Sequence, residues 1–206
     1  MSLRYFDETF EKQRYVIAID DGFFPPEAKG GKGKTVLVSL LYNVSRLVPV
    51  ETCIQLVDID GRYAEKYIVQ CCRELASSGI DVDAIILDNI TFAGFDTVNP
   101  KNIYHALGRT VIAVFKRRPR IDRIKKALEE HFTDWRERLQ PFTDIEKLVH
   151  ELKLERGYVY LYVEPTHDLP KALEVLKQLS IHSPTPEPLR QAHIIASIIS
   201  RALIWR

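Results

Sequence analysis

Residues 15–22 read Tyr-Val-Ile-Ala-Ile-Asp-Asp-Gly, and residues 83–90 read Asp-Ala-Ile-Ile-Leu-Asp-Asn-Ile. Each stretch is an aliphatic, β-branched run that ends in a carboxylate and a turn. Such a run is typical of a buried strand that carries a charge to the exposed end of a sheet. Two such strands in one chain indicate a shared divalent cation, because carboxylates brought together without one repel each other. Metal-assisted chemistry on a phosphate is therefore the first functional hypothesis.

The composition is that of a globular protein. The chain has 206 residues, of which 46% are hydrophobic and 28% are charged, so we expect one domain over residues 1–206 with a sizeable core. No apolar stretch reaches the roughly 20 residues that span a bilayer, and no secretion leader is recognisable. We therefore expect a cytoplasmic protein without a membrane partner. Three cysteines without metal-ligand spacing favour reduced thiols; they are Cys53, Cys71 and Cys72.

The net charge is only +1, so any attraction of nucleic acid must come from local patches. Two basic patches are present in the sequence. One is a glycine-rich loop and the other follows an expected strand; their cations are Lys29, Lys32 and Lys34, and Arg117, Arg118 and Arg120. Each patch is either a solvated face or a contact for the DNA backbone.

Hydrophobic periodicity predicts alternating strands and helices. Strands are expected at residues 15–20, 35–46, 52–58, 83–88, 110–115 and 157–163, and helices at 62–77, 100–107, 121–128, 144–153 and 169–179. The segment 35–46 also fits one helical face, but its β-branched content favours a strand. A last helix carries the apolar stripe Leu189, Ala192, Ala196, Ile199 and Leu203. This order predicts an α/β domain with a mixed sheet.

Several aspartates follow the expected strands, namely Asp20, Asp21, Asp58, Asp60 and Asp88. Any one of them can simply cap a turn, but the carboxyl ends of neighbouring parallel strands converge on a crevice. Carboxylates there can hold Mg²⁺ beside a phosphate. Side-chain parity places Asp20 and Asp21 on opposite faces of their strand, so only one of them is expected to point into a given site.

A lysine and a histidine follow two other expected strands. Lys116 ends the strand 110–115 and can stabilise an oxyanion, or it can begin a basic surface turn. His167 follows the strand 157–163 and is either a site residue or an ordinary hydrogen-bonded histidine.

Residues 29–35, Lys-Gly-Gly-Lys-Gly-Lys-Thr, resemble the Walker loop of partitioning-type ATPases. Two features oppose this interpretation. Position 28 is alanine rather than glycine, and the segment that follows is weakly helical, whereas a P-loop opens a helix whose N-terminus holds the phosphate. A nucleotide triphosphatase and a non-catalytic nucleic-acid-binding protein remain alternatives to a nuclease.

Residues 87–96, Leu-Asp-Asn-Ile-Thr-Phe-Ala-Gly-Phe-Asp, resemble the most distinctive segment of the endonuclease dU family. This mainly archaeal family is similar to endonuclease V. The resemblance runs from about residue 14 to 204, and it is supported by residues 19–23, 59–61, 114–119 and 186–193. It implies a ribonuclease H-like fold and Mg²⁺- or Mn²⁺-dependent cleavage of DNA near a deaminated base, deoxyuridine in particular.

The likeness to endonuclease V also implies roles for individual residues. It makes Asp20 and Asp88 metal ligands, Lys116 the active-site lysine and His167 the active-site histidine. A third acidic ligand is expected between the third strand and the next helix. Asp60 is the first candidate for it and Glu65 the second.

The chain departs from the family pattern at two positions. Asn89 stands where the family usually has glycine, and Tyr63 stands where it tends to have a further aspartate. The second change implies a lost ligand and bears on catalytic competence. The lysine-rich loop looks like an insertion, which makes it a candidate contact for the DNA backbone.

Overall fold

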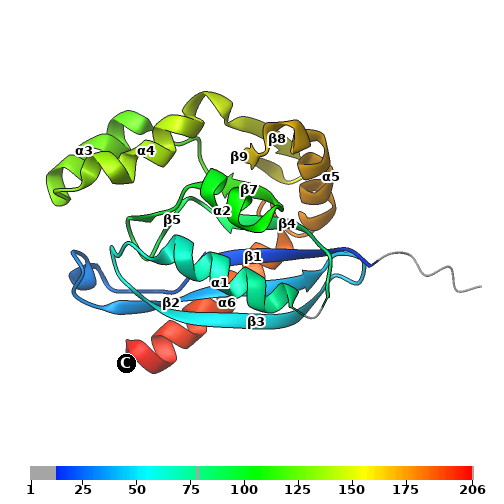
Figure 1. The fold of residues 1–206 in the computed structure, drawn as a ribbon, viewed down its shortest axis with the longest axis horizontal. Helices are drawn as coiled ribbons and strands as arrows, with labels where there is room; N and C mark the ends of the chain where they lie inside the picture. The colour runs from blue at the N-terminus through cyan, green and yellow to red at the C-terminus, as the bar shows by residue number, and fades with distance from the viewer. Residues whose placement is uncertain (1–12, 78, 206) are drawn as a thin grey trace, which may run out of the picture.

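The computed structural model describes residues 13–77 and 79–205, which form a seven-stranded mixed sheet with helices on both faces (Figure 1). The strands run in the order β3-β2-β1-β4-β7-β9-β8. They are β1 (Tyr15–Asp21), β2 (Lys34–Asn43), β3 (Val48–Asp58), β4 (Val82–Asp88), β7 (Thr110–Phe115), β8 (His150–Leu154) and β9 (Gly157–Glu164). The central strands β1, β4 and β7 are parallel, and the strands on both flanks are antiparallel to their neighbours. The predicted mixed sheet of ribonuclease H-like topology is confirmed.

Helices cover the two faces of this sheet. They are α1 (Ala64–Ala76), α2 (Pro100–Leu107), α3 (Ile121–His131), α4 (Trp135–Ile145), α5 (Leu169–Leu179) and α6 (Glu187–Ile199), with short helical turns η1 (Pro26–Ala28), η2 (Glu146–Leu148), η3 (Thr166–Asp168) and η4 (Ser200–Ile204). A two-stranded hairpin of β5 (Thr91–Phe92) and β6 (Asp96–Thr97) follows β4. Figure 1 shows α1 in front of the sheet and α6 behind it. None of the helices in the described ranges is long and apolar enough to cross a membrane.

Alternation along β1 divides the core into two layers. Ile17 and Ile19 pack with α1, α2 and α4, while Val16 and Ala18 pack with α5 and α6. Burying one aliphatic side chain of this size contributes about 1.5–3 kcal/mol. The pleat of β1 therefore also decides which layer each of the following aspartates faces.

Most predicted elements are confirmed, but the helix expected at 144–153 is wrong. These residues form the end of α4, the turn η2 and the strand β8. In β8 the buried Leu152 is flanked by exposed neighbours, a period of two that fits a strand. The expected capping threonine, Thr143, lies inside α4, where its hydroxyl bonds to the Leu139 carbonyl.

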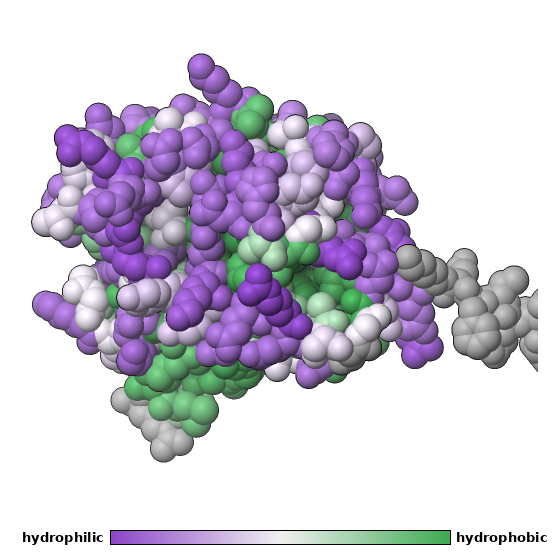
Figure 2. All heavy atoms as spheres, in the orientation of Figure 1, coloured by the Kyte–Doolittle hydropathy of each residue, from purple (hydrophilic) through white to green (hydrophobic). Residues whose placement is uncertain are grey.

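The apolar stripe of the last helix is also interrupted. Leu189, Ala192 and Ala196 are buried, but Leu203 is 70% exposed. The reason is that α6 passes into the π-helical turn η4, closed by a bond from the Trp205 amide to the Ser200 carbonyl. The wider turn rotates Leu203 away from the core, and Figure 2 shows apolar side chains gathered at this projecting end of the chain.

The expectation of reduced thiols is wrong for two of the three cysteines. Cys53 on β3 and Cys71 on α1 form a disulfide, and Cys72 is free and buried. The helix α1 packs over the face of β3 that carries Cys53. Their separation in the chain gives no sign of this packing.

Candidate active site

Two aspartates lie side by side at the carboxyl edge of the sheet. The parallel strands β1 and β4 pair Ile19 with Leu87, so Asp20 and Asp88 lie at the same level near the carboxyl ends of their strands. Side-chain alternation along each strand places both aspartates on the face of the sheet that α5 and α6 cover. Asp20 is 3% exposed, and Asp88 is largely buried. The predicted convergence of these two carboxylates is present in the structure.

Lys116 reaches the same place from β7. Asp88 pairs with Val114, so Lys116, two residues later, follows the same face. Its Nζ lies 3.2 Å from Asp88 Oδ2. Burial lowers the pKa of Lys116, but the carboxylates of Asp88 and Asp20 outweigh burial and raise it. The lysine is therefore a fixed cation beside the carboxylate pair.

A histidine that the sequence did not single out completes the cluster. His193 on α6 places Nδ1 at 2.9 Å from Asp20 Oδ2. The hydrogen bond to Asp20 raises the pKa of His193, although burial opposes it. Because a carboxylate only accepts hydrogen bonds, Nδ1 is the donor in this pair. The segment 186–193 that resembles the family includes this histidine, which was the one available signal.

Asp21 points to the opposite face of β1, as parity predicts. Its Oδ2 accepts a hydrogen bond of 2.7 Å from the Ala93 amide. Burial and the charges of Asp20 and Asp88 raise the pKa of Asp21 to about 8, despite that hydrogen bond. Burial and Asp20 also raise the pKa of Asp88, which Lys116 partly offsets. Three acidic side chains thus lie close together at one edge of the sheet, and each negative charge there opposes the ionisation of the others.

This oxygen-rich set fits a hard divalent cation, which would relieve the repulsion. Within the described residues the carboxylates do not place three oxygens within 4.8 Å of one another. The arrangement therefore resembles a Mg²⁺ site, in which one or two carboxylates are supplemented by water and phosphate oxygens, rather than a closed protein cage. Asp20 and Asp88 are the residues placed to hold such an ion.

The structure does not bring Asp60, the first candidate for the third ligand, to this pair. Asp60 has a φ of 58°, and its two oxygens accept the amides of Gly30 at 2.7 Å and Phe95 at 2.8 Å. Its own amide donates to the Ala93 carbonyl. Asp60 therefore fastens two loops together, and its expected position as a ligand is corrected.

The second candidate, Glu65, also has a structural role. Its carboxylate accepts the Asn99 amide at 2.8 Å and the Asn102 side chain at 3.1 Å, at the start of α2. Tyr63 is exposed at the beginning of α1, and its amide donates to Asp96. The third acidic neighbour of the pair in this chain is instead Asp21.

The expected position of His167 is wrong. β9 runs antiparallel to β7 and pairs Glu164 with Val111, so the residues that follow β9 lie at the amino-terminal end of β7. Lys116 lies at the other end. The side chain of His167 is 79% exposed and contacts Asp168.

The basic residues have separate surroundings. Lys34 opens β2 and pairs with Asp58 at 2.5 Å, so the lysine-rich loop leads into a strand rather than a helix. The P-loop interpretation is therefore wrong. Arg118 donates to the Val149 carbonyl and Arg120 pairs with Asp122. Lys29 and Lys32 are exposed on the loop.

A cavity of about 580 Å³ opens beside the cluster, and its wall includes Asp88, Lys116 and Arg117. Asn89, Phe95 and Phe115 also line it. Asn89 has a φ of 87°, a conformation that glycine adopts freely and asparagine tolerates. This explains how asparagine replaces the glycine usual in the family.

Comparisons with known proteins agree with this architecture. A protein of unknown function from Archaeoglobus fulgidus superposes with a TM-score of 0.72 at 22% identity, over 90% of this chain and 97% of that one. Human ENDOV superposes with a TM-score of 0.59 at 13% identity, over 92% of this chain and 85% of that one. Endonuclease V of Ciona intestinalis, in complex with DNA containing inosine followed by a ribo-adenosine, superposes with a TM-score of 0.56 at 13% identity. The superposition covers 92% of this chain and 87% of that one. These likenesses confirm the endonuclease V-like fold.

The sequence relatives are archaeal. A UPF0215 protein of Pyrococcus furiosus is 32% identical over 186 residues, which is 90% of this chain and 92% of the relative. One of Pyrococcus horikoshii is 33% identical over 189 residues, 92% and 93% of the two chains. The family model described as endonuclease dU matches residues 12–200. The resemblance seen in the sequence is confirmed, and the chain belongs to the endonuclease dU family.

Proposed function

We propose that this protein is a metal-dependent endonuclease that hydrolyses a phosphodiester bond of DNA near a deaminated base. The observation that carries the proposal is a pair of buried carboxylates, Asp20 and Asp88, which lie at the same level on neighbouring strands with Lys116 beside them. The family and the endonuclease V-like fold support it. The DNA in the Ciona complex supports a nucleic-acid partner.

Asp20 and Asp88 would hold Mg²⁺ or Mn²⁺, which when bound supplies a Lewis acid for the phosphate and an activated water. The remaining chemistry belongs to the protein. Lys116 holds positive charge where the leaving oxygen develops negative charge. The proton on Nδ1 of His193 fixes the orientation of Asp20. The helix α6 thereby positions a residue of β1.

The cavity beside Asp88 is the place for the altered base. A base must leave the stack to be read, and extrusion is easiest at a damaged or mismatched pair. The cavity offers aromatic walls from Phe95 and Phe115 and a side-chain amide from Asn89. We take deoxyuridine as the first substrate to test because the family description names it.

The test incubates labelled duplexes that contain uracil, hypoxanthine or only normal bases with Mg²⁺ or Mn²⁺. The parent should cut one modified duplex, and Asp88→Asn should not. Asp122→Asn, which changes an exposed aspartate paired with Arg120, is the matched control and should cut like the parent. If Asp88→Asn cuts as well as the parent, the site is assigned wrongly. If no duplex is cut but DNA is retained, the protein is a non-catalytic nucleic-acid-binding protein.

A further inference from the structure

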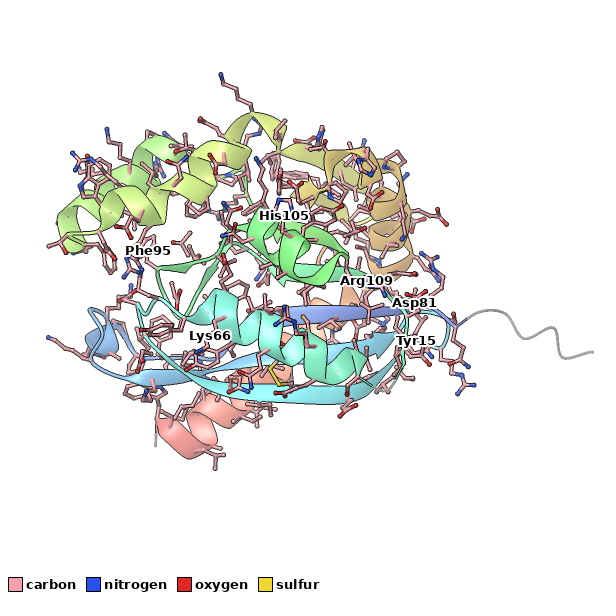
Figure 3. All side chains as sticks on the ribbon, viewed as in Figure 1. Tyr15, Lys66, Asp81, Phe95, His105 and Arg109 are labelled. Atoms are coloured by element: carbon pink, nitrogen blue, oxygen red, sulfur yellow. A yellow bond between two sulfur atoms is a disulfide. The ribbon has the colours of Figure 1, made fainter. Side chains whose placement is uncertain are left out.

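A second cavity of about 580 Å³ shares Phe95 with the cavity beside Asp88. Four separate segments build it. The loop between β1 and β2 contributes Phe24 and Lys29, the turn after β3 contributes Asp60, the hairpin turn contributes Gly94, and the end of α3 contributes His131. Figure 3 shows Phe95 between this loop and the helices α3 and α4.

Three aromatic rings line the second cavity, from Phe24, Phe95 and Phe132. The rings of Phe95 and Phe132 meet edge to face with centroids 5.7 Å apart. The guanidinium of Arg138 lies 4.4 Å from the centroid of Phe132. Phe132 is therefore held between a ring and a cation, which fixes one wall of the cavity.

The floor of the second cavity is equally fixed. Asp60 accepts the amides of Gly30 and Phe95. Gly94 has a φ of 94°, and a Cβ there would collide with the Asp60 carboxylate. Arg138 donates to the carbonyls of Asp60, Gly61 and Phe95. The polar groups of the floor thus satisfy one another, and the aromatic walls are left as the contact surface.

We propose that the second cavity binds an unstacked base of the DNA strand, separate from the base beside the cleaved bond. This inference rests on the proposed function, because it assumes that the strand crosses the carboxyl edge of the sheet. Every base has a π face, so aromatic walls without unpaired polar groups bind bases with little sequence preference. Lys29 is exposed at the cavity, where its ammonium would face the phosphates of the same strand.

The test measures binding of short single-stranded oligodeoxynucleotides in EDTA, with one abasic position moved along the strand. In the parent, one abasic position should weaken binding by about tenfold, the scale of one base–aromatic stack. In Phe24→Ala, the intact strand should bind as weakly as that abasic strand, and the penalty at that position should disappear. Tyr158→Ala removes an exposed aromatic of β9 and should keep the penalty.

Two further variants separate stacking from damage to the loop. Phe24→Trp keeps an aromatic ring and should restore the penalty. Lys29→Ala should weaken binding equally for every position of the abasic site. It should also reduce by about one the slope of the logarithm of the binding constant against the logarithm of salt concentration. If no abasic position weakens binding, or if the penalty persists unchanged in Phe24→Ala, the proposal is overturned. A position-specific penalty without Mg²⁺-dependent cutting would keep this inference and reject the proposed function. Mg²⁺-dependent cutting without a position-specific penalty would keep the proposed function and reject this inference.

Discussion

The carboxylates at the edge of the sheet and those in the neighbouring turns differ in what contacts their oxygens. Asp60, Glu65 and Asp96 accept hydrogen bonds from backbone amides of other loops. Asp20 and Asp88 instead contact the side chains of His193 and Lys116, and the backbone amide that Asp20 accepts belongs to its own neighbour, Asp21, rather than to another loop. Backbone amides do not titrate and their positions are set by the fold, so the first group has a structural role. The second group faces partners that a cation or a phosphate can rearrange.

Asp21 stands between the two groups. It accepts one backbone amide, from Ala93, and it also experiences the charges of Asp20 and Asp88. The comparison therefore teaches that the kind of partner, more than the position after a strand, separates a structural carboxylate from a reactive one. The following predictions test this separation.

The largest effect is expected at the paired carboxylates. Asp20→Asn and Asp88→Asn should each reduce Mg²⁺-dependent cutting about a hundredfold or more, since loss of a supporting partner alone costs up to about that much. The same variants should melt at or above the parent temperature in EDTA, because they remove a repelling charge. A fall in melting temperature that accounts for the lost activity would place Asp20 and Asp88 in the structural group.

His193 and His167 lie at opposite ends of the strands, so substitutions of the two can be compared directly. His193→Ala should lower the cutting rate about tenfold to a hundredfold, because Asp20 loses the partner that orients it. His167→Ala should leave the rate unchanged. Rates are compared at saturating DNA and several Mg²⁺ concentrations. Equal effects of the two substitutions would contradict the placement of the site.

A structural carboxylate should show the opposite pattern. Asp96→Ala leaves the amides of Tyr63 and Ala64 without their acceptor at the start of α1. We expect a loss of about 1–3 kcal/mol in the free energy of unfolding, measured by urea denaturation. Asp96→Asn retains an oxygen acceptor and should lose less. Loss of cutting without loss of stability would move Asp96 to the reactive group.

The most gradual effect is a pH dependence of stability in the metal-free protein, spread over several pH units. Asp21 keeps its proton below a pH of about 8 when folded, whereas its ordinary pKa is 3.8. Between these values the folded state holds more protons than the unfolded chain, so the free energy of unfolding should fall as pH rises toward 8. The fall should be weaker in Asp21→Asn. If the free energy of unfolding of parent and variant depended on pH in the same way in EDTA, this prediction would be contradicted.

Much of the site follows from local sequence. Runs of β-branched residues predict β1, β4 and β7, and the parallel order brings Asp20, Asp88 and Lys116 together. His193 could not be placed in this way, because α6 returns to β1 from the far end of the chain. Asp60 was misassigned because an aspartate after a strand looks the same whether its oxygens face a metal or backbone amides.

Other errors have the same origin in contacts between distant segments. The strand β8 exists because it pairs with β9, while its residues also fit the continuation of a helix. The disulfide depends on the packing of α1 over β3. Periodicity reports which face of an element is apolar, but it does not report which element covers that face.

The bond between Cys53 and Cys71 closes a covalent ring through the turn that contains Asp60 and Arg62. Arg62 is a partly exposed residue of that turn, within reach of a protease such as trypsin. A cut there would open the polypeptide without separating the pieces, because the sulfur atoms would still join β3 to α1. Such a nicked chain would migrate as one species without reductant and as two with it.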